Sequence, residues 1–187
     1  MADISFTSRI IPTTRDYFSK FTQAMPYDCY VDYPYRISSS RIQKNVLTTH
    51  VCDCTACLVT DGEKAMLMHL IPSHEPNHDI GKVSNFIKTN FNINNKENMQ
   101  ALILGSHQYK SSQHIFNNFI NFFNKLKIPT TILRIGKSPT DIAYKTSTDE
   151  IIITNKDIAN ALKEGKNKTD ALKSGFKEVK ISEFDEI

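Results

Sequence analysis

The chain has 187 residues, of which 40% are hydrophobic and 23% are charged, and its formal net charge is +3. This is the composition of an ordinary globular protein, and the length suffices for one domain with a substantial core. Lys and Arg form no dense cluster interleaved with aromatic residues, which argues against a nucleic-acid partner. No apolar run approaches the roughly 20 residues that a membrane-spanning helix needs, so we expect no insertion into a membrane.

The N-terminal sequence and the cysteines bear on localisation. The stretch MADISFTSRIIPTTRDYF lacks the apolar core of a signal peptide. The chain has four cysteines, and the bunching of three of them at residues 52–57 differs from the framework of a secreted disulfide-rich domain. We therefore expect a cytoplasmic protein with reduced thiols, and export by a specialised secretion system without a cleaved signal stays open.

Hydrophobic periodicity and turn residues predict the secondary structure. In chain order the predicted elements are a helix at 13–24, an edge strand or extended arm at 28–37, strands at 46–51, 54–60 and 64–71, a loop at 73–79, a helix at 79–91, a strand at 99–104, a helix at 111–127, and strands at 130–135, 142–146 and 150–154. The helix at 111–127 carries an aromatic stripe at helical spacing, which indicates core packing against a sheet.

The order of these elements predicts the fold class. A strand, a helix and a strand over 99–135 indicate one parallel pair, and the tight turns elsewhere indicate antiparallel pairs. We expect an α/β (α+β) fold, a mixed β-sheet sandwich packed with helices. Residues 1–40 are expected to form an N-terminal helix and extended arm, 41–155 the main domain, and 156–187 a C-terminal helical cap or loosely docked tail.

The most distinctive stretch is HVCDCTACLVTDGEKAMLMHLIP at residues 50–72. One interpretation is a zinc or iron–sulfur module, whose candidate ligands are Cys52, Cys54, Cys57, His50, His69, His74 and His78. Against it, no second paired set of ligands follows, and strand alternation would place Cys57 on the face opposite Cys54. A redox pair of Cys54 and Cys57 is also disfavoured, because a thioredoxin-type pair opens a helix and a strand is predicted here.

A second interpretation is a cysteine nucleophile with an imidazole base. The dipeptide Asp61-Gly62 predicts a hairpin, and a turn centred on it would place His69 directly opposite Cys54. His69 would be the polar group on an otherwise apolar face, which also fits a structural core histidine. Alternation over 46–60 places Thr48 on the same face, where it could hold the ring or donate to substrate. Cys52 shares that face and stays open as the nucleophile.

The order of these residues resembles the CheD family, the chemoreceptor glutamine deamidases. That family has a Thr six residues before its nucleophilic Cys, an Asp in the turn seven residues after it, and a His in a strand end that closes with Pro. Thr48, Cys54, Asp61 and the His69 of MHLIP stand at these positions. The similarity covers about residues 40 to 155, including KIPTTILRIG and the hairpin IAYKTSTDEIIIT. A similar sandwich with a Cys–His pair occurs in deamidating toxins such as cytotoxic necrotizing factor.

The resemblance implies that Cys54 is the nucleophile, His69 the base and Thr48 the third member of the site. The implied reaction converts a glutamine of a partner protein to glutamate through a thioester, without a cofactor. The backbone N–H groups of Asp53 and Cys54 would be the oxyanion donors. We further expect Asp53 to face away from the thiol, and the imidazole to lower the pKa of Cys54, making it the most readily alkylated thiol.

The chain also departs from the family. Cys52-Asp53 stands where CheD proteins have a small pair such as Gly-Ser, and GSHQYKSSQ replaces a Gly-Gly stretch and a Gly/Asn-containing segment at the start of a helix. These segments surround the substrate surface in CheD, so the target is expected to be a chemoreceptor-like protein or a host protein. A non-catalytic binding protein on the same scaffold is the remaining alternative.

Overall fold

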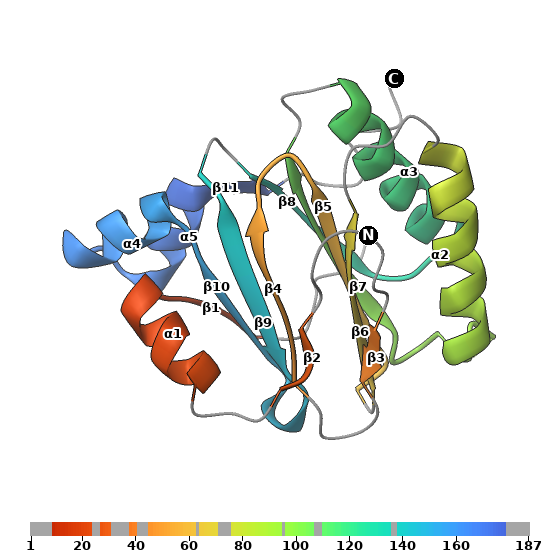
Figure 1. The fold of residues 1–187 in the computed structure, drawn as a ribbon, viewed down its shortest axis with the longest axis horizontal. Coiled ribbons are helices and arrows are strands. Elements are labelled where there is room, and N and C mark those ends of the chain that lie inside the picture. The colour runs from red at the N-terminus through yellow and green to blue at the C-terminus, as the bar shows by residue number, and fades with distance from the viewer. Residues whose placement is uncertain are drawn as a thin grey trace.

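The computed structural model describes residues 9–23, 27–30, 38–40, 45–62, 64–70, 76–94, 96–106, 110–135 and 138–178. Within these ranges, the strands form two mixed sheets of five and six strands that face each other (Figure 1). Helices pack on the outer sides of both sheets. The predicted fold class, a mixed β-sheet sandwich packed with helices, is confirmed.

The five-stranded sheet has the order β1–β10–β9–β4–β2. Its strands are β1 (Arg9–Pro12), β10 (Glu150–Thr154), β9 (Thr140–Lys145), β4 (Asn45–Val51) and β2 (Tyr27–Tyr30). β1 is parallel to β10 and β2 is parallel to β4, whereas the other neighbours are antiparallel. β2 is an edge strand and overlaps the segment predicted as an edge strand or arm, of which residues 31–37 lie outside the described part.

The six-stranded sheet has the order β11–β8–β7–β5–β6–β3. Its strands are β11 (Phe176–Glu178), β8 (Thr130–Ile135), β7 (Gln100–Ser106), β5 (Thr55–Thr60), β6 (Ala65–Leu70) and β3 (Ser38–Ser40). β7 and β8 are parallel and are connected through helix α3 (Lys110–Leu126), as the sequence predicts. The other neighbours are antiparallel.

Two helices cover the six-stranded sheet and one covers the five-stranded sheet. The aromatic stripe of α3 is buried against the six-stranded sheet, together with α2 (Pro76–Asn90). The prediction that this stripe packs in the core is confirmed. α1 (Arg15–Gln23) places Phe18 against Leu47 and Ile152 of the five-stranded sheet. α2 begins three residues before the predicted start because proline is well suited to the first helical position. None of the described helices is both long and apolar enough to span a membrane.

The core between the sheets includes the C-terminal segment. α4 (Lys156–Lys163) begins after Asn155, whose side chain accepts a hydrogen bond from the Ile158 N–H at 2.9 Å. α5 (Lys168–Gly175) follows, and β11 then pairs with β8. Ile158 and Phe176 are buried in the same cluster as Val46 of β4 and Leu58 of β5. Through residue 178 the expected cap or loosely docked tail is therefore an integral part of the central core.

The β5–β6 hairpin forms where Asp61-Gly62 predicts it, but its register differs by two residues. Thr60 pairs with Ala65, so Gly62 occupies the first central position of the turn instead of the second. The Asp61 N–H donates to the Lys64 carbonyl at 3.3 Å, and the Asp61 carboxylate accepts from the Lys64 N–H at 2.9 Å. Gly62 has φ 84°, a left-handed conformation that glycine adopts without strain. The predicted pairing of Cys54 with His69 is therefore wrong, and His69 pairs with Ala56.

Candidate functional site

Residues 46–60 do not form one continuous strand. β4 belongs to the five-stranded sheet and β5 to the six-stranded sheet, so residues 52–54 carry the chain from one sheet to the other. A register shift between Thr48 and Val51 breaks the alternation, and His50 adopts a left-handed φ of 57° and is exposed. The prediction that one alternating face carries Thr48, His50, Cys52 and Cys54 is wrong, because such a bulge reorients every later side chain.

An aspartate holds this bulge in place. The His50 backbone N–H donates to Asp141 Oδ1 on β9 at 2.9 Å. The bond crosses between neighbouring strands of the five-stranded sheet at the point where their ladder is irregular. Asp141 therefore stabilises the turn that directs the chain towards Cys54, and no sequence motif indicated this role.

Thr48 and His69 meet across the core between the two sheets. Thr48 Oγ1 lies 2.7 Å from His69 Nδ1, within hydrogen-bonding distance. Thr48 is fully buried and His69 is 5% exposed. His69 faces this core because its partner Ala56 and its neighbour Leu67 both belong to the central cluster, with His69 and Ala56 directly paired. The structure thus brings together two of the sequence-predicted site residues from opposite sheets.

The direction of this hydrogen bond determines what the ring can do. If Nδ1 carries the proton, it donates to Thr48 Oγ1, and the lone pair of Nε2 is then available to a second group. In the other tautomer, the Thr48 hydroxyl donates to Nδ1 and Nε2 carries the proton. Only the first arrangement lets His69 act as a general base through Nε2, which is itself buried.

Cys54 lies immediately before β5, partly buried against the same central cluster. In the observed register, it is two residues before Ala56, the residue paired with His69. Cys54 and His69 are therefore related diagonally across the hairpin, a relation in which Cα atoms are typically about 7–8 Å apart and longer side chains can still meet. The two residues share a side of the sheet even though they are not direct partners.

The environment of Cys54 favours the neutral thiol. Burial, followed by the Asp53 carboxylate and the Cys52 thiol, raises the pKa of Cys54 to about 11. A hydrogen bond from the Cys52 backbone acts in the opposite direction but does not prevent this rise in pKa. The expected lowering of the Cys54 pKa by His69 is therefore wrong. Asp53, which was expected to face away from the thiol, raises this pKa.

Cys57 does not converge with Cys54. Cys57 is fully buried on the opposite face of β5, among Met66, Met68 and the residues of α2 and α3. The prediction that Cys57 and Cys54 lie on opposite faces is confirmed. Among the described residues, no group of three His, Cys, Asp or Glu side chains is placed to hold a metal ion, and His74 and the His78 side chain lie outside them.

A serine anchors the segment that carries Asp53 and Cys54. The Ser112 hydroxyl, in the first turn of α3, donates to the Asp53 carbonyl oxygen at 2.7 Å. Ser112 is 1% exposed, so this hydrogen bond joins two distant parts of the sequence inside the protein. Sequence reasoning missed this residue because its signal, a serine near the start of a helix, is common and carries no information about a partner 59 positions away.

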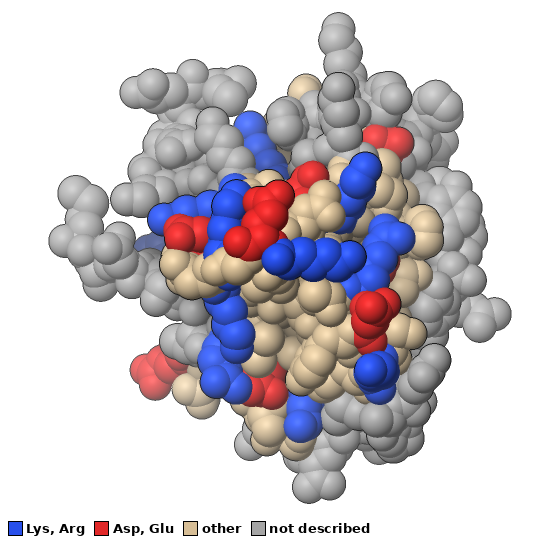
Figure 2. All heavy atoms as spheres, turned by 90° about the vertical axis from the view of Figure 1, so that its left-hand side faces the viewer, with Lys and Arg blue, Asp and Glu red and all other residues tan. Residues whose placement is uncertain are grey.

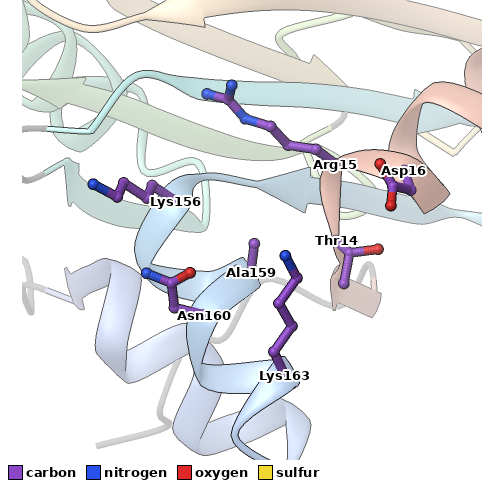
Figure 3. A pocket seen from close by; sticks show the side chains of 7 residues that line it. All are labelled: Thr14, Arg15, Asp16, Lys156, Ala159, Asn160 and Lys163. Atoms are coloured by element: carbon purple, nitrogen blue, oxygen red, sulfur yellow. The ribbon is translucent and has the colours of Figure 1, made fainter.

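A separate cavity of about 220 Å3 lies between the start of α1 and α4 (Figure 3). Its lining residues are Thr14, Arg15, Asp16, Lys156, Ala159, Asn160 and Lys163. The three basic side chains are exposed, and Lys and Arg are interspersed with Asp and Glu over this face of the molecule (Figure 2). None of the lining residues belongs to the group around Thr48, His69 and Cys54.

No model of a known protein family matches the chain, and no curated protein sequence matches it significantly.

Proposed function

We propose that the chain is a protein-glutamine deamidase, with Cys54 as the nucleophile, His69 as the general base and Thr48 as the residue that orients the ring. The observation that carries this proposal is the 2.7 Å contact between Thr48 Oγ1 and His69 Nδ1. In the proposed arrangement the Thr48 hydroxyl accepts from Nδ1–H, which leaves Nε2 as the basic nitrogen. The third member of a nucleophile–base–orienting group is thus paired with the base across the core.

The raised pKa of Cys54 affects the proposed mechanism. At neutral pH the Cys54 thiol is uncharged, so the protein does not rest as a thiolate–imidazolium pair. His69 instead removes the proton while Cys54 Sγ attacks, as a histidine does for a serine nucleophile. The protein substrate would bind over Cys54, which is only partly buried.

The proposed reaction has two steps. Cys54 Sγ forms a bond to the carboxamide carbon of a glutamine side chain, and the thiol proton passes to His69. His69 then protonates the leaving nitrogen, the C–N bond breaks, and ammonia departs to leave a thioester. Water attacks the thioester and His69 accepts a proton from that water. His69 returns this proton to Cys54 Sγ as the C–S bond breaks, which releases glutamate and restores the Cys54 thiol. Backbone N–H groups of Asp53 and Cys54 stabilise the oxyanion in both steps.

The substrate in this proposal is a chemoreceptor-like or host protein that presents a glutamine on its surface. The reaction needs no cofactor and requires a reduced thiol, which fits a cytoplasmic setting.

The experiment follows oxygen from water into glutamate. Purified protein is incubated with cell-extract proteins in water enriched in oxygen-18, and peptides are examined by mass spectrometry. Wild-type protein should produce labelled glutamate at specific former glutamine positions, Cys54→Ser should not, and His69→Ala should reduce the yield. The Cys52→Ser variant is the matched control and should retain activity. If wild-type and Cys54→Ser samples give the same labelled sites, the proposal is wrong.

The raised pKa of Cys54 also favours one alternative, a non-catalytic binding protein on the same scaffold. In that case, the Thr48–His69 bond would serve only to join the two sheets. The same experiment separates the two functions, because a binding protein would retain its partner without producing labelled glutamate.

A further inference from the structure

The peptide group between Asp53 and Cys54 is held by a buried hydroxyl from another element. Ser112 Oγ donates to the Asp53 carbonyl oxygen at 2.7 Å, and Ser112 is 1% exposed. A buried serine hydroxyl without a hydrogen bond is energetically costly, so this contact favours one orientation of the peptide. The contact links α3, on the outer face of the six-stranded sheet, to the segment that crosses between the sheets.

The geometry of a trans peptide group transmits this constraint to the next residue. The carbonyl oxygen of one residue and the N–H of the following residue point in opposite directions in the same plane. With the Asp53 carbonyl directed towards Ser112, the Cys54 N–H points away from α3. The Cys54 side chain packs on that opposite side, against the central cluster that His69 also faces.

We propose that Ser112 is a positioning residue that aims the Cys54 N–H at the oxygen of a substrate carbonyl attacked by Cys54 Sγ. This inference rests on the proposed function, since it assigns an oxyanion donor to that reaction. The rest of the segment is also constrained, because the Cys52 backbone donates to Cys54 Sγ and the His50 N–H is bound by Asp141. Ser112 differs from these contacts because it determines the direction of the N–H next to the reacting atom.

Two reagents separate the orientation of the N–H from the reactivity of the thiol. Acylation by p-nitrophenyl acetate joins Cys54 Sγ to the acetyl carbon, passes the thiol proton to a base, and builds negative charge on the carbonyl oxygen before p-nitrophenolate leaves. Alkylation by iodoacetamide displaces iodide and forms no oxyanion. A correctly aimed N–H should therefore accelerate only the acylation.

The experiment measures both second-order rate constants at Cys54 by peptide mass spectrometry, in a Cys52→Ser background. Ser112→Ala should lower the acylation rate about tenfold or more, while the alkylation rate changes less than about twofold. Ser174→Ala is the matched control, because its exposed hydroxyl donates to the Asp170 carbonyl at 2.9 Å within α5, and both rates should stay unchanged. Ser112→Thr keeps the hydroxyl and should preserve the wild-type ratio of the two rates.

Other outcomes overturn the inference in distinguishable ways. If both rates fall equally in Ser112→Ala, the serine is merely structural, and if neither falls, it has no role in the site. If Ser112→Ala does not fold, a loss of the wild-type ratio in folded Ser112→Thr is sufficient to reject the inference. The proposed function fails separately if His69→Ala leaves the acylation of Cys54 unchanged, whatever the result for Ser112.

Discussion

Thr48 Oγ1 lies 2.7 Å from His69 Nδ1, although Thr48 belongs to the five-stranded sheet and His69 to the six-stranded sheet. A second polar contact crosses the core further along the hairpin, where Thr60 Oγ1 lies 3.2 Å from Tyr144 Oη. The two contacts fix the relative position of the sheets, because a hydrogen bond requires closer alignment than apolar packing does. The candidate site therefore depends on the packing of two sheets and not on the geometry of one hairpin.

Loss of the Thr48 hydroxyl should destabilise the protein. Thr48→Val preserves the shape of the side chain but removes the bond to His69 Nδ1, so the free energy of unfolding should fall by about 1–3 kcal/mol. Thr48→Ser retains a hydroxyl, so its free energy of unfolding should fall less than that of Thr48→Val. Urea denaturation measures both values, and nitrogen-15 spectra of His69 should show a change of tautomer only in Thr48→Val. Equal stability of Thr48→Val and wild type would contradict the assignment.

The cysteines should react with iodoacetamide in an order opposite to the one expected from the sequence. Burial and Asp53 raise the pKa of Cys52 as well, but the pKa of Cys54 rises further, to about 11. At pH 8, Cys52 should therefore be alkylated before Cys54, and the rate at Cys54 should increase steadily between pH 9 and 11, since the thiolate is the nucleophile. Site-resolved mass spectrometry provides the rates. Rapid alkylation of Cys54 at pH 7 would show that the thiolate is stabilised after all.

The buried thiol of Cys57 should make stability fall in alkaline solution. Burial raises the pKa of Cys57 well above 9, so the thiol stays protonated in the folded protein while the unfolded chain ionises. The unfolded state then binds fewer protons, and the free energy of unfolding decreases as the pH rises above about 9.

Cys57→Ala should remove part of this dependence. Its free energy of unfolding should be lower than that of wild type at pH 8, because a packed side chain is truncated, and the difference should narrow by pH 10. Denaturation curves at pH 8, 9 and 10 measure the trend. A constant difference across this range would argue against a raised pKa of Cys57 in the folded state. Reactivity of Cys54 should be unaffected by this substitution, because the two side chains lie on opposite faces of β5.

Gly105 should not tolerate a methyl group. A Cβ at this position would lie 2.5 Å from Phe116 Cδ2 and 3.1 Å from Thr55 Oγ1, so Gly105→Ala would push α3 away from the sheet. We expect a loss of about 1–3 kcal/mol in the free energy of unfolding. Gly81→Ala in α2 is the matched control, since a Cβ there has no neighbour within 4 Å and alanine favours a helix by about 0.5–1 kcal/mol. Similar effects of the two substitutions would show that α3 packs less closely than described.

The strained backbone at His50 should be relieved by glycine. The left-handed conformation costs a non-glycine residue about 1–2 kcal/mol, which exceeds the additional entropy of glycine in the unfolded chain. His50→Gly should therefore raise the melting temperature, and so should Lys127→Gly, where φ is 54° at the end of α3. Lys127 is the comparison site without a role near Cys54. A fall in melting temperature for His50→Gly alone would show that the histidine side chain stabilises the bulge.

The sequence by itself determined the fold class and the strands between residues 46 and 154, because these depend on local patterns. The seven strands predicted between residues 46 and 154 are all present, with ends that differ by no more than two residues. Periods of two and of 3.6 residues, together with Gly62, are local signals that each element carries within its own residues. The opposite facing of Cys54 and Cys57 was also predictable, because parity within one strand survives a register shift of two residues.

Only the tertiary structure decided how the site is assembled. A dipeptide indicates a turn but does not show which residues occupy its centre. The Asp61 carboxylate, which accepts from the Lys64 N–H, stabilises a register in which His69 pairs with Ala56 and not with Cys54. The bulge at His50 breaks the alternation between Thr48, in the five-stranded sheet, and Cys54, next to the six-stranded sheet. Burial raises the pKa of the Cys54 thiol, whereas the sequence had suggested that an imidazole would lower it. Ser112 and Asp141 are 59 and 91 residues from the backbone groups that they hold. Such contacts form only when separate elements pack, so no local pattern in the chain encodes them.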